Sequence, residues 1–458
     1  MIAVIGAGPA GLAAAWRTAA SGHEVVVIER APAVGGMAGS FEVAGILVDH
    51  GSHRLHPATP APILAALHGL LGADLQVRPR HGRIRLLDRW VAFPLRTGDL
   101  VRRTPRRFAV RAAADALVGP LRRPRRDTFA EVVRAGLGPA VLDAFYDPYA
   151  RKLWDTPPAQ LAGELARRRV SASSPADIVR RLARGGRPAG RSFLYPRRGF
   201  GAIPEALAEA ARGAGARIRL GSRLEALRLC PDGGWRLALD DGTSLDAEHV
   251  WSTVPLAALA GMADPPPPPT ALDAAARLRH RSMVLLYLVL DRRQWTEYDA
   301  HYFPGPEVFA SRLSEPRNYR DNPDDPADRT VLCAEIPCWP GDEVWQSADT
   351  DLASRLGREL VAAGLPSAHP VEVASRRLPH VYPVYPPGFA DDLVALERWA
   401  ASAGVVSFGR QGLFTPDNTH HALAMGWAAA EALRPDGTLD RAAWQAARDG
   451  FRSFVVED

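Results

Sequence analysis

The chain has 458 residues, of which 47% are hydrophobic, and a formal net charge of +5 that is carried almost entirely by arginine. This length exceeds one compact core, so we expect two domains. No run of eighteen apolar residues suggests a membrane-spanning helix, and no basic and apolar leader precedes the first strand. The three cysteines form no C-x-x-C pair, so we expect a reduced, cytoplasmic protein without a structural metal.

The N-terminal segment carries the most specific pattern of the chain. Ile2–Ile5 is an apolar run that is typical of a buried parallel strand. Three glycines follow in a G-x-G-x-x-G spacing: Gly6, Gly8 and Gly11. Such glycines allow a tight turn, a close approach of a pyrophosphate to the backbone, and close helix packing. The helix predicted at about Ala10 to Ala20 points its first amides at the phosphates, which makes Pro9 and Ala10 candidate cofactor contacts.

An acidic residue completes this pattern. A second apolar run, Val25–Ile28, is followed by Glu29, eighteen residues after Gly11. A carboxylate at this offset can accept a hydrogen bond from a ribose 2′-hydroxyl and repels a 2′-phosphate, so NADP is not expected. The alternative, a plain strand–turn–helix unit, does not explain three glycines and a carboxylate at these offsets. The sequence therefore predicts a dinucleotide site.

A second glycine cluster indicates which dinucleotide is bound. Glu29-Arg30 is followed after four residues by Gly35-Gly36-Met37. This stretch resembles the ER-x-x-x-x-GG extension of FAD enzymes of the amine-oxidase and protoporphyrinogen-oxidase superfamily. The resemblance implies noncovalent FAD, with the ADP half at the first glycine turn and the double glycine near the flavin. Arg30, Gly35, Gly36 and Met37 are therefore candidate cofactor contacts.

Three histidines follow the predicted strand Ile46–Asp49 at a spacing of three: His50, His53 and His56. We expect no metal there, because a Gly-Ser turn does not hold them on one face and no carboxylate or cysteine cluster follows. The pattern Asp49-x-Gly51-x-His53-x-x-His56 resembles a stretch of UDP-galactopyranose mutases in which the first histidine lies against the flavin. By that resemblance His53 is a cofactor contact and a candidate catalytic residue, whereas the alternative is a polar loop.

Residues 57–194 are predicted to leave the cofactor-binding fold. A hairpin is expected over 83–94, and helices follow it. Nine arginines fall within Arg102–Arg126, where Asp115 is the single acid. The open alternatives are a solvated basic face, a contact with an anionic membrane surface, or a site for a pyrophosphate-bearing substrate. Nucleic acid is not expected, because few aromatic residues interleave with the arginines.

Another specific stretch reads Tyr149-x-x-Lys152-x-Trp154 and continues to Arg169. It resembles the substrate-domain segment Y-x-x-K-x-W-G of the mutases, although the asparagine- and tyrosine-rich stretch of those enzymes is replaced at 170–174. By resemblance Tyr149, Trp154 and Arg169 are substrate contacts, with core packing as the alternative for Trp154. Lys152 is the only lysine of the chain, and because an ammonium has a movable pKa it is a candidate catalytic residue.

The chain is expected to return to the cofactor domain over residues 195–262. A strand is predicted at Arg223–Leu229, and the resemblance places a backbone contact with the adenine near Leu224. Residues 250–255 read V-W-S-T-V-P and resemble the V-x-S-T-x-P strand of the superfamily.

A substrate-domain sheet is predicted over residues 263–390, with strands at Met283–Leu290 and Val331–Ile336. Tyr382 and Tyr385 belong to a proline-rich stretch that is expected to form an exposed, rigid lip. We expect these two tyrosines to border the substrate pocket.

The C-terminal segment 391–458 contains a closing motif. Residues 409–418 resemble the superfamily pattern G-R-x-G-x-F-x-x-x-N, in which a final helix aims its N-terminus at the flavin N1–C2=O edge. A helix is predicted from Thr419 with Asn418 as its N-cap, and its dipole would favour an anionic reduced flavin. By this resemblance Gly409, Arg410, Asn418 and Thr419 are candidate cofactor contacts.

Together these patterns predict an α/β fold, in which a Rossmann-type FAD-binding domain is interleaved with a mixed α+β substrate domain and a helical excursion. The expected function is an FAD-dependent oxidoreductase that transfers a hydride from a small organic substrate to flavin N5. One alternative is a mutase-like isomerase of a nucleotide sugar without net redox change, and another is an FAD-binding protein without catalysis. The substrate is expected to be small, with an anion or a nucleotide sugar as options, and Arg102–Arg126 offers a peripheral membrane contact.

Overall fold

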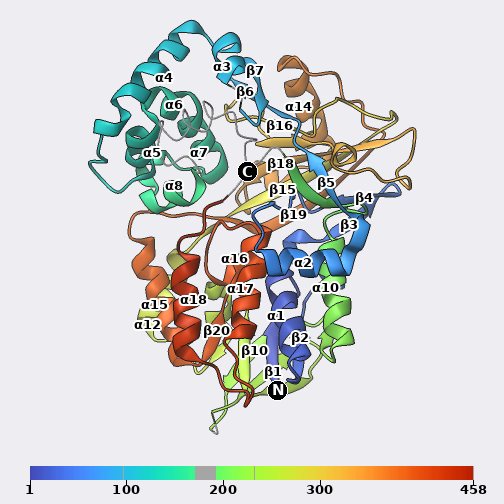
Figure 1. Ribbon diagram of the computed structural model, residues 1–458, viewed down its shortest axis with the longest axis vertical. Coiled ribbons are helices and arrows are strands. Elements are labelled where there is room, and N and C mark those ends of the chain that lie inside the picture. Colours follow the sequence, from blue (N-terminus) through green and yellow to red (C-terminus); the bar gives the residue numbers. More distant parts are fainter. Residues whose placement is uncertain (96, 171–191, 232, 457–458) are drawn as a thin grey trace.

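The structure is a computed structural model that describes residues 1–95, 97–170, 192–231 and 233–456. The molecule is elongated, with the N-terminus at the end of its lower half and the larger sheet and many helices in its upper half (Figure 1). Residues 171–174, part of the stretch in which the chain departs from the mutase pattern, lie outside the described residues.

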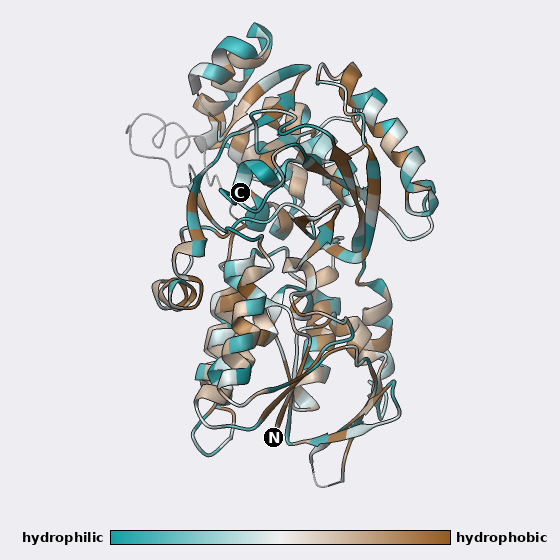
Figure 2. Ribbon diagram, turned by 90° about the vertical axis from the view of Figure 1, so that its right-hand side faces the viewer, coloured by the Kyte–Doolittle hydropathy of each residue, from teal (hydrophilic) through white to brown (hydrophobic). Residues whose placement is uncertain are grey.

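A five-stranded parallel sheet organises the lower half, in the order β20-β13-β1-β2-β9. Its strands come from distant parts of the chain: β1 Ile2–Ile5, β2 Val25–Ile28, β9 Arg217–Arg219, β13 His249–Ser252 and β20 Val405–Ser407. The strands β1 and β2 are hydrophobic throughout, because both faces of the sheet are covered. The hydrophobic strands appear brown at the centre of the lower half in Figure 2.

Helices cover one face of this sheet: α1 Pro9–Ala20, α2 Ala61–Leu71, α10 Ala202–Gly213, α17 Thr419–Glu431 and α18 Arg441–Phe451. Gly426 allows α17 to approach α1 closely, since a Cβ there would overlap the carbonyl oxygen of Ala10. The other face packs on a small sheet of β10 Leu224–Leu229, β11 Trp235–Leu239, β12 Ser244–Ala247 and β14 Ala263–Asp264. Three more helices complete that side: α11 Leu256–Ala260, α12 Pro269–Arg277 and α15 Phe389–Ser402.

The upper half contains a seven-stranded mixed sheet in the order β19-β15-β18-β17-β16-β6-β7. Its strands are β6 Gly82–Leu86, β7 Arg89–Phe93, β15 His280–Leu290, β16 Ala300–Tyr302, β17 Arg312–Ser314, β18 Thr330–Cys338 and β19 Glu372–Pro383. The helix α14 Asp349–Ala362 packs on one face. The hairpin of β3 Ser40–Val43 and β4 Ile46–Asp49 packs on the other, which joins the sheet to the N-terminal segment.

The predicted excursion forms a group of helices beside this sheet, drawn in cyan and teal in Figure 1. They are α3 Thr97–Arg103, α4 Arg106–Val118, α5 Phe129–Leu137, α6 Pro139–Val141, α7 Asp147–Trp154 and α8 Gly163–Arg169. A two-stranded sheet of β5 Leu75–Pro79 and β8 Ser192–Pro196 lies where the excursion begins and ends. In the described part of the chain, no helix combines the length and apolarity that a bilayer crossing requires.

The parallel sheet joined to a second, mixed sheet confirms the predicted fold class. The predicted exposed lip is wrong. The strand β19 includes this stretch as far as Pro383 and pairs Tyr382 with Arg281 of β15. Tyr385 is buried, because its ring stacks on Phe389 and its hydroxyl donates to the carbonyl of Phe414 over 2.6 Å.

Candidate functional site

The first glycine turn joins β1 to α1, and its three glycines have different functions. Gly6 has φ +102°, and a Cβ there would overlap Thr253 Oγ1. A Cβ at Gly11 would overlap the carbonyl oxygen of Gly6, so only glycine lets α1 pack this close to the turn. Gly8 is the N-cap of α1, and its Cβ position has no other atom closer than 4.0 Å. Space beside the backbone therefore exists where the sequence predicted a phosphate.

The second glycine cluster packs directly on the first. Gly35 and Gly36 have φ values of +116° and +54°, which favour glycine. The amide of Gly35 donates to the carbonyl of Ala7 over 2.8 Å, and Gly36 lies against Gly8. The two glycine segments therefore form one continuous wall of backbone.

Glu29 follows the end of β2 and is nearly buried. Its two carboxylate oxygens accept hydrogen bonds from the amides of Ala7 and Ala31, over 2.8 and 2.9 Å. Each oxygen keeps a second lone pair, which can accept from a ligand hydroxyl. The Glu29 side chain thus connects the glycine turn to the segment that directly follows β2.

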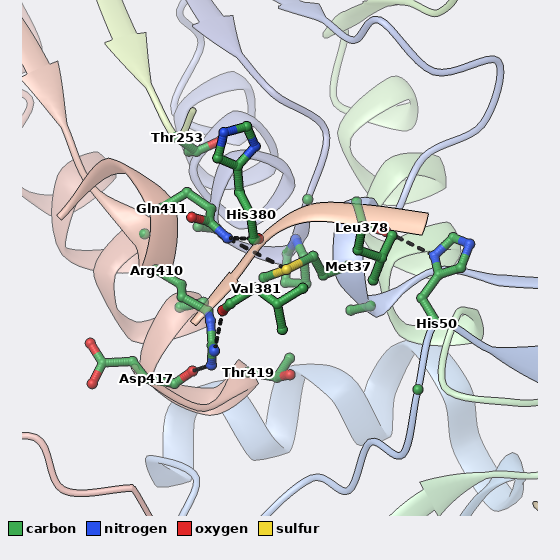
Figure 3. Close-up of a pocket in the computed structure, with 18 of the residues that line it drawn as sticks. Met37, His50, Thr253, Leu378, His380, Val381, Arg410, Gln411, Asp417 and Thr419 are labelled. Atoms are coloured by element: carbon green, nitrogen blue, oxygen red, sulfur yellow. Dashed lines mark hydrogen bonds between the residues drawn. The ribbon is translucent and has the colours of Figure 1, made fainter. Parts of the chain in front are cut away.

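The C-terminal motif reaches the same place from the other end of the chain. Asn418 is the N-cap of α17 and forms a capping box with His421. The guanidinium of Arg410 donates to the carbonyls of Val381 and Asp417, both over 2.7 Å (Figure 3). Arg410 therefore links the motif to β19 of the upper half.

A cavity of about 500 Å³ lies between the two halves of the molecule. Many of the predicted residues line it: Gly6, Gly8, Pro9, Ala10, Glu29, Arg30, Gly36, Met37, His53, Tyr149, Arg169, Leu224, Tyr382, Gly409, Arg410, Asn418 and Thr419. The described lining does not include five others: Gly11, Gly35, Lys152, Trp154 and Tyr385. Gly11 and Gly35 shape the glycine turns from behind, and the remaining three need correction.

Lys152 does not face the cavity. Its ammonium is surrounded by the carbonyl oxygens of Phe303, Gly305, Val308 and Ala310, with distances of 2.5, 2.6 and 3.3 Å to the first, third and fourth. Burial lowers the pKa of Lys152 to about 8, which nearby Glu307 and Glu359 partly offset. The catalytic prediction for Lys152 is therefore not supported by its position, which instead fixes α7 to the loop between β16 and β17.

Trp154 and Tyr385 are core residues. Trp154 is 1% exposed and contacts the rings of Phe129 and Tyr149. Tyr385 is equally buried. Of the predicted substrate contacts, Tyr149, Arg169 and Tyr382 do lie on the cavity wall, where Arg169 stacks on the ring of Tyr382 with 5.4 Å between guanidinium carbon and ring centroid.

His53 lies in the cavity wall with its ring stacked on Phe200. Its Nε2 is 2.9 Å from the carbonyl oxygen of His50. Burial lowers the pKa of His53 below its usual value, an effect that Asp49 partly offsets, so the imidazole is neutral near pH 7. In a neutral ring Nε2 must donate to that carbonyl, which leaves Nδ1 as the hydrogen-bond acceptor.

Sequence reasoning missed four arginines of the cavity wall: Arg54, Arg80, Arg312, and Arg223 beside the predicted adenine contact Leu224. Arg54 pairs with Asp299 over 3.1 Å, and Arg312 makes a bidentate contact with Glu335 over 2.8 and 2.9 Å. Arg80 also lines the cavity. Arg54 lies within the histidine motif, directly after His53, and was detectable from that neighbourhood. The sequence around Arg80 and Arg312 contains no motif that indicates a site. These two residues reach the cavity wall only through the tertiary structure.

The wall of the cavity is strongly basic. Among the described residues that line it are seven arginines: Arg30, Arg54, Arg80, Arg169, Arg223, Arg312 and Arg410. Three carboxylates also line it: Glu29, Glu335 and Asp417. Each carboxylate already has protein partners, because Glu29 accepts from two amides, Glu335 binds Arg312, and Asp417 accepts from Thr415. The cavity is therefore suited to negatively charged ligands.

Comparison with known proteins gives a consistent result. A family model described as flavin containing amine oxidoreductase matches residues 9–387. A reduced UDP-galactopyranose mutase is similar in structure, with a TM-score of 0.82 and 21% identity over 100% of this chain and 99% of that chain. A candidate protoporphyrinogen oxidase from Exiguobacterium sp. 255-15 has a TM-score of 0.73 and 20% identity over 94% and 97% of the two chains.

Cyclohexylamine oxidase from Brevibacterium oxydans IH-35A has a TM-score of 0.66 and 17% identity over 94% of this chain and 98% of that chain. At such identities the likeness concerns the fold. No curated protein sequence matches the chain significantly.

Proposed function

The chain belongs to the family of flavin-containing amine oxidoreductases, and we propose that it is an oxidoreductase whose substrate is a small organic anion. The cofactor is FAD. The residues fit it: Gly8 leaves room beside the backbone, the N-terminus of α1 faces that room, and Glu29 retains acceptor capacity for a ribose hydroxyl. When bound, FAD supplies a two-electron acceptor for a substrate hydride.

The basic wall of the cavity carries the proposal for the substrate. Besides the candidate cofactor contacts Arg30 and Arg410, the wall contains Arg54, Arg80, Arg169, Arg223 and Arg312. A cationic amine would meet this excess of arginines, since the three carboxylates of the described lining already have protein partners. A carboxylate or phosphate would instead receive charge-assisted hydrogen bonds from guanidinium groups, which are planar and suited to oxyanions. Arg169 and Arg54, both on the cavity wall, are the arginines that we expect to hold such a group.

His53 is proposed as the residue that handles a proton. Its Nε2 is committed to the carbonyl of His50, so Nδ1 is the atom that can accept a proton or a hydrogen bond. Because burial lowers its pKa, the ring is neutral and ready to accept near pH 7. The stacking on Phe200 restricts the ring to one orientation.

The decisive experiment is anaerobic reduction of the bound flavin by added substrate. The loss of the flavin's visible absorbance measures this reduction. Matched substrates that differ in charge should be compared, such as hydroxy acids against amino alcohols and simple amines. We expect bleaching by members of the anionic set. In Arg169→Met the concentration for half-maximal reduction should rise about 10-fold to 100-fold, the equivalent of one charged hydrogen bond. Bleaching by amines alone would contradict the proposal.

A second candidate function is a mutase-like isomerisation of a nucleotide sugar without net redox change. The observation that favours it is the position of His53, Tyr149, Arg169 and Tyr382 on one cavity wall, all of which the sequence matched to mutase motifs or substrate contacts. The two functions differ in electron balance. Activity that requires previously reduced flavin and consumes no acceptor supports the isomerase, and stoichiometric consumption of an acceptor excludes it.

Failure of both would favour the third alternative, a flavoprotein without catalysis. That outcome requires a yellow protein whose flavin is released by denaturation but is not reduced by a broad panel of charged and neutral compounds.

A further inference from the structure

The helix α4 presents an apolar stripe to solvent. Arg106–Val118 is continued by a 3₁₀ turn, Gly119–Leu121. Large apolar side chains along this segment are unusually exposed, by 69% for Val110, 83% for Leu117, 46% for Val118 and 83% for Leu121. The exposed alanines Ala113 and Ala114 lie between them. Spacings of three and four residues place side chains on one face of a helix.

The opposite side of α4 fixes how the helix is oriented. Asp115 is buried, accepts from the amide of Ala140 over 2.9 Å and binds Arg122 over 2.7 Å. Gly138 packs so closely on Asp115 that a Cβ there would overlap it. Asp115 therefore holds its side of α4 against the protein, and the apolar stripe faces outward.

Arginines stand at both ends of the stripe. Those before it are Arg102, Arg103, Arg106 and Arg107, Arg111 follows its first residue Val110, and those beyond its C-terminal end are Arg123, Arg125 and Arg126, all of them exposed. The acidic residue within this span, Asp115, faces the protein and is bound by Arg122. The exposed face thus combines apolar side chains with an excess of positive charge, in which Arg103 is paired with Asp99 over 2.6 Å.

We propose that this α4 surface, Arg102–Arg126, is a docking surface for an anionic lipid bilayer. An apolar stripe bounded by basic residues is the arrangement with which amphipathic helices lie in a membrane interface. The helix is about 20 Å long at 1.5 Å per residue, which allows shallow insertion parallel to the bilayer and no crossing. Its arginines would contact lipid phosphates while the leucines and valines enter the boundary of the acyl chains.

The charge of the α4 surface favours an anionic bilayer over a second copy of the chain as its binding partner. Two α4 surfaces facing each other would bring the arginines of one copy against those of the other, which is unfavourable without compensating acids. Nucleic acid would satisfy the arginines but would leave the apolar stripe in water. A lipid surface matches both the charge and the stripe. The surface belongs to the outer edge of the upper half, away from the parallel sheet (Figure 1).

The test is co-sedimentation of the FAD-loaded protein with vesicles made of equal parts phosphatidylcholine and phosphatidylglycerol. Binding is expected at low salt and should fall strongly at about 1 M salt, where the screening length is about 3 Å. Vesicles of phosphatidylcholine alone should retain little protein. The double variant Leu117→Asp with Leu121→Asp should bind about tenfold less or weaker still, since it removes the inserting side chains.

A matched control replaces two exposed valines elsewhere on the upper half, Val361→Asp with Val371→Asp. This control should bind vesicles as the wild type does, and all variants should retain equal FAD content as evidence of folding. Equal binding by the α4 variant and the control overturns the proposal, as does absence of binding at low salt. Light scattering measures the oligomeric state. A dimer that forms with the wild type but not with the α4 variant would show that a second copy, not a membrane, covers the stripe.

Discussion

The two halves of this protein build their shares of the cavity by different means. In the lower half the glycine turns contribute backbone to the wall, where Gly8 and Gly36 lie against each other and Gly35 supports them from behind. The upper half contributes charged side chains whose partners come from other elements, 245 residues away for Arg54 with Asp299 and 23 residues away for Arg312 with Glu335. The part of the cavity wall in the lower half therefore depends on glycines, which have no side chain. The part in the upper half depends on ion pairs that form only in the folded protein.

The largest effect should come from Gly11→Val, which tests the backbone-built half. The added side chain would collide with the carbonyl of Gly6 and force α1 away from the turn. We expect protein without flavin, or insoluble protein, as measured by the absorbance ratio of flavin to protein. Gly69→Ala in α2 is the control, because nothing lies within 4 Å of its Cβ position. A yellow, stable Gly11→Val protein would contradict the close-packing argument.

Lys152→Met tests the side-chain-built half. It leaves four carbonyls of the loop 303–310 without their ammonium donor, which should cost about 3 kcal/mol of unfolding free energy. The neighbouring Arg151→Met is the control, since Arg151 is exposed and pairs with Asp147 at the surface. Urea unfolding gives the stability, and faster amide hydrogen exchange in 303–310 should accompany the loss. The FAD content should be unchanged. A loss of FAD would show that cofactor binding in the lower half depends on this contact in the upper half.

His53→Ala addresses the point at which the two halves meet. FAD should remain bound, because we expect the glycine turns and Glu29 to provide most of its anchoring through the ADP half. The rate of flavin reduction should fall by about 10²-fold if the imidazole acts as an acid or base. Rapid-mixing kinetics with the same substrate measures this rate. Equal rates at equal FAD content would make His53 a wall residue without a chemical role.

Glu29→Gln should produce a smaller change, confined to the lower half. The side-chain amide can accept from only one of the amides of Ala7 and Ala31, so one of these donors loses its partner. A loss of about 1–2 kcal/mol corresponds to roughly 10-fold weaker FAD binding. Titration of the FAD-free protein with FAD measures the affinity. Unchanged affinity would remove Glu29 from the cofactor site.

An effect of comparable size, but seen only at acid pH, is expected in the upper half. Burial lowers the pKa of His301 to about 3, so the unfolded chain takes up its proton first as the pH falls. The stabilising effect of neutral His301 is complete above the ordinary pKa of 6.5 and declines below it, by about 2 kcal/mol at about pH 5. Urea unfolding between these values should show a shallower pH dependence for His301→Gln than for wild type. Parallel curves would contradict the assignment.

Local pattern was sufficient for the lower half because its signals are contiguous. The strand Ile2–Ile5, the glycine turn and the helix from Pro9 are all consecutive in the chain, and each was predicted where it was found. The same applies to Asn418 as an N-cap before Thr419. Such features depend on backbone conformation and on the spacing of hydrophobic residues. Both can be predicted from the residue types of a short segment.

The sequence alone therefore determined the FAD-binding half, the family resemblance and the identity of His53 and Arg169 as cavity residues. Tertiary structure decided that Lys152 fixes a loop rather than facing the cavity, and that Trp154 and Tyr385 are core. It also decided that Arg312 reaches the wall and that the apolar face of α4 points outward. The physical reason is that a charged or aromatic side chain takes its role from partners that are distant in sequence, whereas a glycine turn takes its role from its own backbone.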